Sequence, residues 1–395
     1  MTAILIIGAG ESGVRAAFAL RGQGFDGTIT LIGEEAALPY ERPPLSKNPQ
    51  AAPKAIRPAS AYTDAGITLR LGARVSGIDP AARSVTLADG DCLTYDSLLL
   101  ATGARARLFP GMAGCLTLRS DRDATAIQAQ LRPRARIGII GGGFIGLELA
   151  ATARKAGAEV TVIEAAPRVL GRAVPQEIAA RVADRHGAEG ARLLTGADVA
   201  AADARRITLA DGTALDFDAV IAGVGARPET ALAEAAGITV DNGIVVDGQF
   251  RTSDPNIFAA GDCCNFQWRG TRIRLESWKA AQDQGAHVAT AMLGGSDAYA
   301  KVPWFWSDQY DLTLQVAGLF DMGRPVRCRE TGDDKTLVFQ CDADGRLSAA
   351  AGIGPGNRIA KDLRIFEKLI ERGARIDPHV LADPAENLKR QLKAA

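Results

Sequence analysis

Hydrophobic residues near the start of the chain form two continuous runs separated by a helical pattern. The run AILII is followed by the small-residue segment ESGVRAAFAL, and the second apolar run is TITLIG. A short apolar run bounded by glycines is typical of a buried strand in a parallel sheet. Residues 2–42 therefore predict a strand, a glycine turn, a helix and a second strand.

The same order of elements returns in the second quarter of the chain. Residues 136–150, RIGIIGGGFIGLELA, place an apolar run before another small-residue helix, and EVTVIE follows as the next strand. Both copies contain the spacing G-x-G-x-x-G, with Gly8, Gly10 and Gly13 in the first and Gly141, Gly143 and Gly146 in the second. Each second strand ends in a carboxylate, Glu34 in the first copy and Glu164 in the second.

This glycine pattern has a known physical basis. The first glycine permits a tight turn, the second lets the backbone approach a diphosphate, and the third lets helix and strand pack closely. The diphosphate binds the N–H groups at the helix N-terminus, and the carboxylate accepts hydrogen bonds from a ribose. Two such units in one chain predict two bound dinucleotides, with electron transfer between them as the reason for holding both.

The segments that follow each glycine unit also resemble one another. Residues 66–87 alternate apolar and polar positions and predict antiparallel strands, as do the strand patterns within residues 207–228. A buried strand then ends in ATGARA, which includes Thr102 and Gly103, and GVGARP with Gly225 takes the same place in the second copy. Small residues after such a strand fit either close passage of the backbone beside a ligand or a plain β-turn. The repeat therefore extends to whole domains.

Three further segments carry candidate ligand contacts. Paired prolines in LPYERPPLSK predict an extended, non-helical segment that presents Arg42 and Lys47, either as ligand cations or as solvated charges. A strand ending in AAGD is expected to enter a helix at Asp262, which then either binds a ribityl hydroxyl or caps that helix. From residue 303 the chain becomes rich in tryptophan, and strand alternation places Trp304 and Trp306 on one face. Such aromatic residues form either core or a cofactor wall.

Two helices complete the pattern, over residues 278–293 and 359–372. The second ends a small α+β domain. It carries a stripe of cations at helical spacing, which fits either a solvated face or a surface that steers an acidic partner: Lys361, Arg364, Lys368 and Arg372.

Composition narrows the class of protein. The 395 residues are 47% hydrophobic and 23% charged, as in ordinary globular proteins. Lys plus Arg equals Asp plus Glu at 46 each, so no global field favours nucleic acid or anionic lipid. We expect no membrane span and no signal peptide, and hence a cytoplasmic protein. The six cysteines lack CxxC spacing, so neither a metal site nor a disulfide framework is expected, and Cys263 and Cys264 are interpreted as packing residues.

Two glutamates carry specific hypotheses. Glu148 follows Gly146 inside a helix that should be buried, where an unpaired carboxylate would cost several kcal/mol. Glu164 is followed by two alanines, so its carboxylate can accept from an adenosine 2′-hydroxyl and would repel a 2′-phosphate. The hypothesis on Glu164 predicts that the protein binds NADH in preference to NADPH.

Several motifs together resemble one family along nearly the whole chain: GAGESGVRAAFALR, PYERPPLSK, LLLATGARAR, GGGFIGLELA, GVGARP, TSDPNIFAAGDC and PWFWSDQY. They are similar to the FAD-dependent, NADH-using ferredoxin reductases of bacterial oxygenase and cytochrome P450 systems. The resemblance implies an α/β fold of glutathione-reductase type, with two Rossmann-like dinucleotide-binding domains and a small α+β C-terminal domain. The expected boundaries are 1–108 and 233–302 for the FAD domain, 109–232 for the NADH domain and 303–395 for the C-terminal domain.

The resemblance also implies residue roles. Lys47 would pair with Glu148 beside the isoalloxazine and nicotinamide rings, and Trp306 would lie by the flavin, so these three are the candidate catalytic residues. The residues expected at FAD are Gly8, Gly10, Gly13, Glu34, Arg42, Lys47, Thr102, Gly103, Asp262 and Trp306. Those expected at NADH are Gly141, Gly143, Gly146, Glu148, Glu164 and Gly225.

The predicted function is electron transfer from NADH through FAD to a small iron–sulfur ferredoxin, of the [2Fe–2S] type, by a monomer or weak homodimer. One alternative keeps both dinucleotides but sends electrons to oxygen or a quinone. Another is a protein resembling apoptosis-inducing factor, in which NADH binding drives a conformational switch. The absence of cysteines after the first ribose-binding acid argues against a disulfide reductase.

Overall fold

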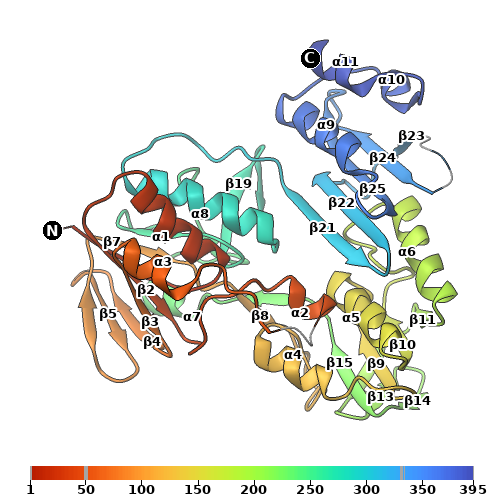
Figure 1. Cartoon of the computed structure of the whole chain (residues 1–395), viewed down its shortest axis with the longest axis horizontal. Helices are drawn as coiled ribbons and strands as arrows, with labels where there is room; N and C mark the ends of the chain where they lie inside the picture. The colour runs from red at the N-terminus through yellow and green to blue at the C-terminus, as the bar shows by residue number, and fades with distance from the viewer. Residues whose placement is uncertain (1, 49–51, 330–331, 333, 395) are drawn as a thin grey trace. The chain divides into compact units, whose positions relative to one another are not determined.

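The computed structural model describes residues 2–48, 52–329, 332 and 334–394 (Figure 1). The chain divides into two compact units, each built from separate stretches of sequence. Unit 1 comprises Met1–Arg42, Pro53–Arg105 and Ala226–Lys301, and unit 2 comprises Pro43–Ala52, Ala106–Gly225 and Val302–Ala395. The four-part domain division expected from the sequence stays a prediction.

Unit 1 is organised around a five-stranded parallel sheet in the order β18-β7-β1-β2-β3. The strands are β1 Ala3–Ile7, β2 Thr28–Gly33, β3 Ile67–Leu71, β7 Ser97–Leu100 and β18 Ile257–Ala259. Strand β7, between β18 and β1, ends in three consecutive leucines that are fully buried, as expected for a strand covered on both faces. Helix α1 (Glu11–Gly22) and helix α8 (Trp278–Met292) lie side by side (Figure 1). A Cβ at Gly285 of α8 would lie 2.5 Å from the Ser12 carbonyl oxygen, so this close helix contact requires glycine.

Smaller elements surround this sheet. Strands β4 (Val75–Asp79), β5 (Ser84–Leu87) and β6 (Cys92–Thr94) pair in antiparallel fashion, as do β19 (Cys264–Trp268) and β20 (Thr271–Ile273). Strand β17 (Ile244–Val245) joins β19 in parallel. The remaining elements are α3 Ala59–Asp64, α7 Ala231–Ala235, β8 Ala104–Ala106 and β16 Ala226–Pro228.

Unit 2 begins with a four-stranded parallel sheet in the order β11-β10-β9-β15. Its strands are β9 Arg136–Ile140, β10 Glu159–Glu164, β11 Arg192–Thr195 and β15 Ala219–Ala222. The helices are α2 Pro44–Lys47, α4 Asp121–Gln128, α5 Phe144–Lys155 and α6 Gln176–Ala188. An antiparallel sheet of β12 (Val199–Ala202), β13 (Arg206–Leu209) and β14 (Ala214–Asp216) is attached.

The last part of unit 2 is an antiparallel sheet in the order β21-β22-β25-β24-β23. Its strands are β21 Trp304–Gln309, β22 Leu312–Gly318, β23 Arg327–Arg329, β24 Thr336–Cys341 and β25 Leu347–Pro355, and its helices are α9 Ala360–Glu371, α10 Pro378–Ala382 and α11 Leu388–Ala394. One continuous core joins this sheet to α5 and α6, through residues such as Leu147, Val182, Leu314 and Ile353. That shared core positions β21 against α5.

Three local predictions were wrong. The segment Pro44–Lys47 forms the short helix α2, because proline is compatible with the first turn of a helix, where its missing N–H is not needed. Strand β3 pairs with β2 in parallel; the alternation of apolar and polar residues reflects its place at the sheet edge. Asp262 lies in a turn that leads into strand β19, with Gly261 at a φ of 87°, and not at a helix N-terminus. Among the described residues, no helix is long and apolar enough to cross a membrane.

Candidate functional site

The glycine turn of unit 1 combines tight packing with one open position. Gly8 follows β1 at a φ of 111°, and a Cβ there would lie 2.1 Å from the Ala101 carbonyl oxygen. A Cβ at Gly13 would lie 2.0 Å from the Gly8 carbonyl oxygen. A Cβ at Gly10, however, would meet no described atom within 4 Å. Gly8 and Gly13 are therefore required by the fold, whereas Gly10 keeps the approach to the α1 N-terminus open.

The second turn repeats this arrangement in unit 2. Gly141 has a φ of 103°, and its Cβ would lie 2.4 Å from the Gly223 carbonyl oxygen. A Cβ at Gly146 would lie 2.1 Å from the Gly141 carbonyl oxygen, and again nothing lies within 4 Å of a Cβ at Gly143.

Helix capping supports a ligand at both turns. The N-caps of α1 and α5, Gly10 and Gly143, provide no side-chain hydrogen bond to the first helical turn. Helices α4 and α8 are capped by the hydroxyls of Ser120 and Ser277, but several other helices, such as α6 and α9, also lack a side-chain cap. The open approach at Gly10 and Gly143 is therefore what distinguishes these two helix ends. The uncapped N–H groups and the positive helix end suit a diphosphate, so the residues fit the dinucleotides that the glycine pattern predicts.

The two strand-end carboxylates differ in how firmly they are held. Glu164 accepts hydrogen bonds from the backbone N–H groups of Gly142 at 2.7 Å and Ala166 at 2.8 Å. Glu34 is 75% exposed, and its carboxylate lies 3.7 Å from the Arg74 Nε. Glu164 is thus fixed beside the glycine turn of unit 2, whereas Glu34 is exposed and held only by a long ion pair.

Four other residues predicted at FAD lie in unit 1, namely Arg42, Thr102, Gly103 and Asp262, whereas Lys47 and Trp306 belong to unit 2. The Thr102 hydroxyl donates to the Glu229 carbonyl at 2.6 Å, and Gly103 has a φ of 71° that favours glycine. The Arg42 guanidinium pairs with Glu35 at 2.6 Å and lies over the ring of Tyr40. Asp262 and the last NADH candidate, Gly225, both lie on turns after sheet strands, and Gly225 has a φ of 109° with no described atom within 4 Å of its Cβ position.

The three candidate catalytic residues meet in unit 2. Lys47 of α2 lies 3.8 Å from a carboxylate oxygen of Glu148 on α5. The Lys47 Nζ also lies 5.1 Å from the ring centroid of Trp306 on β21. Helix α2 is anchored on α5 because the Thr152 hydroxyl donates to the Ser46 carbonyl at 2.7 Å.

The carboxylate of Glu148 is only 6% exposed and is compensated by several groups. One oxygen accepts from the Ser307 hydroxyl at 2.6 Å, and the other accepts from the Ser46 hydroxyl. Burial raises the pKa of Glu148 above its ordinary value, while Lys47 and the two serine hydroxyls oppose that rise. This is an acidic group whose charge depends on the surrounding hydrogen bonds.

Sequence reasoning missed Asp308. Its carboxylate lies 3.0 Å from the Lys47 Nζ, accepts from the Trp306 indole N–H at 3.0 Å and accepts from the Thr313 hydroxyl at 2.8 Å. Strand alternation, which places residues 304, 306 and 308 on one face, could have identified it. Trp304 and Trp306 do share a face, with stacked rings 5.6 Å apart.

Comparison with known proteins gives the family. Residues 2–285 match the family model for pyridine nucleotide-disulphide oxidoreductases, and residues 304–392 match that of the reductase C-terminal domain. The chain is 43% identical over 401 residues to the ferredoxin–NAD(+) reductase component of the anthranilate 1,2-dioxygenase system of Burkholderia cepacia, covering 98% of both chains. It is 44% identical over 402 residues to rhodocoxin reductase of Rhodococcus erythropolis, covering 98% of this chain and 93% of that protein.

A solved structure agrees with these relatives. The fold matches that of the covalent putidaredoxin reductase–putidaredoxin complex with a TM-score of 0.93 and 34% identity, covering 100% of this chain and 99% of the other. The chain belongs to the ferredoxin reductase family of flavoproteins. Ferredoxin reductases of this kind are NADH-dependent oxidoreductases with FAD as cofactor. The predicted family, fold class, enzyme class and cofactors are therefore confirmed.

Proposed function

We propose that this ferredoxin reductase passes electrons from NADH through FAD to a small iron–sulfur ferredoxin of the [2Fe–2S] type, which feeds an oxygenase or a cytochrome P450. The observation that carries the proposal is the pair of uncapped glycine turns, one in each unit, in a chain that matches ferredoxin reductases over its whole length. When bound, nicotinamide supplies a hydride, and the flavin accepts it and releases the electrons singly.

The glycine turns are assigned to the two diphosphates. In unit 1, the N–H groups at the start of α1 bind the diphosphate of FAD beside Gly10, and Thr102, Gly103, Arg42 and Asp262 contribute further contacts. Glu34 accepts from its ribose. These assignments rest on the open approach at Gly10 and on the positions of Glu34, Thr102, Gly103 and Asp262 shortly after sheet strands, whereas Arg42 is assigned from the family resemblance.

In unit 2, the start of α5 binds the diphosphate of NADH beside Gly143, and Gly225 lies on a strand-end turn of the same unit. Glu164 accepts from the adenosine 2′-hydroxyl. Its two hydrogen bonds from backbone N–H groups hold the carboxylate in place, so a 2′-phosphate would meet a fixed negative charge. This arrangement favours NADH over NADPH.

Glu148 would lie at the nicotinamide ring, whose oxidised form carries a positive charge. An ionised carboxylate would stabilise that charge, and Lys47 together with the serine hydroxyls favours the ionised form against the rise in pKa that burial causes. Lys47 and Trp306 are assigned to the flavin, with Asp308 fixing both side chains.

The basic side of α9 is assigned to ferredoxin docking. Its apolar face, including Phe366, is buried, and four cations are exposed on the other face: Lys361, Arg364, Lys368 and Arg372. The same helix carries Glu367, which pairs with Arg364, and the exposed Glu371, so the cations exceed the acids only modestly. A local excess of positive charge accelerates association with an acidic partner in a salt-dependent manner. Charge reversal at Lys361 and Arg364 should slow ferredoxin reduction at low salt, whereas reversal of exposed Arg132 should not. Equal effects, or no salt dependence, would refute this docking surface.

Cellular context is part of the proposal. The six cysteines are free thiols, which fits the reducing cytoplasm where NADH is available. A monomer or weak homodimer is proposed, and size-exclusion chromatography over a range of concentrations measures it.

Anaerobic titration with NADH tests the main proposal. The purified protein should be yellow or take up FAD, should be reduced rapidly by NADH, and should then reduce a [2Fe–2S] ferredoxin faster than it reduces oxygen or a quinone. A colourless protein that does not bind FAD would refute the proposal. A long-lived charge-transfer complex that fails to pass electrons to any ferredoxin would favour a redox-sensing switch instead.

A further inference from the structure

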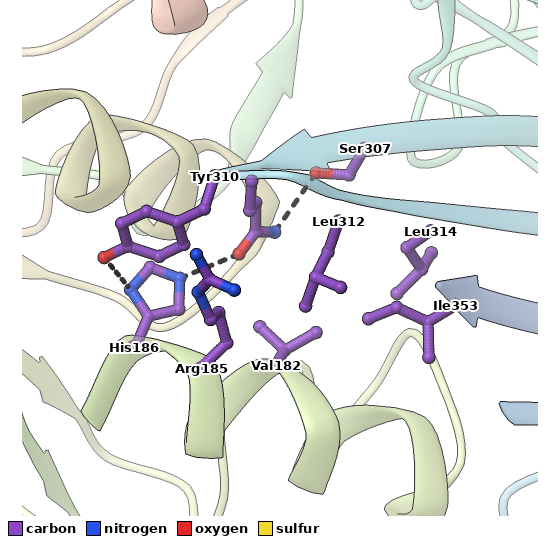
Figure 2. Close-up of a pocket in the computed structure, with 9 residues that line it drawn as sticks. Val182, Arg185, His186, Ser307, Tyr310, Leu312, Leu314 and Ile353 are labelled. Atoms are coloured by element: carbon purple, nitrogen blue, oxygen red, sulfur yellow. Dashed lines mark hydrogen bonds between the residues drawn. The ribbon is translucent and has the colours of Figure 1, made fainter. Parts of the chain in front are cut away.

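A line of buried polar side chains connects Glu148 with helix α6 of the same unit. Figure 2 shows its part from Ser307 to His186 and Tyr310. Ser307 hydrogen-bonds Glu148, and the Gln309 Nε2 lies 3.1 Å from the Ser307 hydroxyl oxygen. The Gln309 Oε1 lies 2.8 Å from the His186 Nε2, and the Tyr310 hydroxyl lies 3.2 Å from the His186 Nδ1. His186 is fully buried and Gln309 is 4% exposed, so these polar groups depend on one another.

The direction of every hydrogen bond follows from the charge on Glu148. An ionised carboxylate only accepts, so the single hydroxyl proton of Ser307 is donated to it. The Ser307 oxygen must then accept from the amide N–H of Gln309, which turns the amide oxygen toward His186. That oxygen requires a proton on the His186 Nε2, and the unprotonated Nδ1 accepts from the Tyr310 hydroxyl.

The surroundings offer few other hydrogen-bond partners to this line of side chains. The cavity beside it has a volume of about 10 Å³ and is walled by Val182, Leu312, Leu314 and Ile353 (Figure 2). This is close to the smallest volume that holds one water molecule, so at most one water could take the place of a side-chain partner there. Burial lowers the pKa of His186, which keeps the ring neutral with a single N–H.

Few charged groups lie close enough to these side chains to alter their hydrogen bonds. Lys47 from α2 and Asp308 from β21 face Glu148, and they act on it with opposite signs. Near His186, Glu189 lies on the same side of α6, and Arg185 pairs with both Glu189 and Asp311. Neither pair donates a hydrogen bond to Gln309 or Ser307 among the described residues.

We infer that His186 and Gln309 are positioning residues, which orient the Ser307 hydroxyl onto Glu148 and thereby hold Glu148 as a carboxylate. All donors point toward the carboxylate, so the bonds polarise one another in a single direction. The inference rests on the proposed role of Glu148 at the nicotinamide.

Two substitutions at one position test the direction of the chain. In Gln309→Glu, the new side chain has nearly the same shape as glutamine, but its ionised carboxylate has only acceptor atoms. The Ser307 hydroxyl proton is then drawn toward this new carboxylate and away from Glu148. In Gln309→Leu, both hydrogen bonds of the amide are lost, but Ser307 can still donate to Glu148. The readout is the charge-transfer absorbance of the NADH-reduced enzyme with NAD⁺ over a range of pH, together with the rate of flavin reduction.

We expect Gln309→Glu to lower the flavin-reduction rate at pH 7.5 about ten-fold or more, the effect of losing a hydrogen bond to a charged group. The pH at which the charge-transfer absorbance appears should rise. The flavin-reduction rate of Gln309→Leu should be at least five-fold higher than that of Gln309→Glu. A purely structural role predicts the reverse order, because leucine leaves buried polar groups of His186 and Ser307 without partners.

His186 gives an independent check. In His186→Leu the amide of Gln309 can turn over, so the rate should fall toward that of Gln309→Glu, and His186→Gln should restore it by supplying a donor near the Nε2 position. The inference would be overturned if Gln309→Glu and Gln309→Leu lowered the flavin-reduction rate equally. It would also be overturned if Glu148→Gln left that rate and the charge-transfer absorbance unchanged. Failure of the wild-type protein to bind FAD or react with NADH would instead reject the proposed function.

Discussion

Replacing Lys47 by methionine should destabilise unit 2, because it leaves the buried carboxylate of Glu148 without its cation. The Lys47 Nζ lies 3.8 Å from that carboxylate. At an effective dielectric constant of about 20, a pair at this distance gains about 4 kcal/mol. Removal of one partner from a fully buried pair costs about 3–5 kcal/mol. The Lys47 side chain is 22% exposed and the hydroxyls of Ser46 and Ser307 remain, so we expect a loss of about 2–3 kcal/mol.

The loss should depend on pH in a definite direction. Burial already raises the pKa of Glu148 above its ordinary value of 4.5, and removing Lys47 raises it further. Between those two values the native state keeps a proton that the unfolded chain has released, so the free energy of unfolding falls as the pH rises. The deficit of Lys47→Met should therefore be largest at pH 8 and should shrink as the pH falls toward 4.5.

Urea unfolding and hydrogen exchange of the α5 amides, at pH 5.5 and pH 8, measure this effect. The double variant Lys47→Met/Glu148→Gln removes both charges and should recover most of the loss at pH 8. The matched control is Lys155→Met, which removes an exposed lysine at the end of α5. It should change the free energy of unfolding by less than about 0.5 kcal/mol. The reasoning is refuted if Lys47→Met costs the same at both pH values, or if the double variant shows no recovery.

Two further predictions concern the dinucleotide site of unit 2. Glu164→Ser should lower kcat/KM for NADH about ten-fold and reduce the preference over NADPH, because the ribose loses a fixed acceptor; a wild-type enzyme with equal kcat/KM for both cofactors would contradict this assignment. Gly146→Ala should lower the Tm because its Cβ would lie 2.1 Å from a carbonyl oxygen, whereas Gly143→Ala should fold normally but bind NADH more weakly, since its Cβ occupies the open approach. Thermal unfolding and NADH titration measure both, and the opposite ranking would show that the roles of the two glycines are wrongly assigned.

The local features of the fold were predictable because short stretches of sequence determine them. Gly8 and Gly141 adopt positive φ at the end of a strand, and the adjoining apolar runs form the predicted parallel strands. The prediction failed where a neighbour decides the outcome. The alternating pattern of Ile67–Leu71 suits an antiparallel strand equally well, and only its pairing with β2 makes it a parallel edge. Pro44 begins a helix because α2 docks on α5.

The candidate site divides in the same way. The sequence by itself determined the two glycine turns and the strand-end acid Glu164, because each requires only a few adjacent residues with a particular backbone conformation. Only the tertiary structure decided which groups surround Glu148, since Ser46, Ser307 and His186 come from distant parts of the chain. A buried carboxylate is stabilised by whichever donors the packed core brings to about 3 Å, and spacing along the chain does not encode that distance.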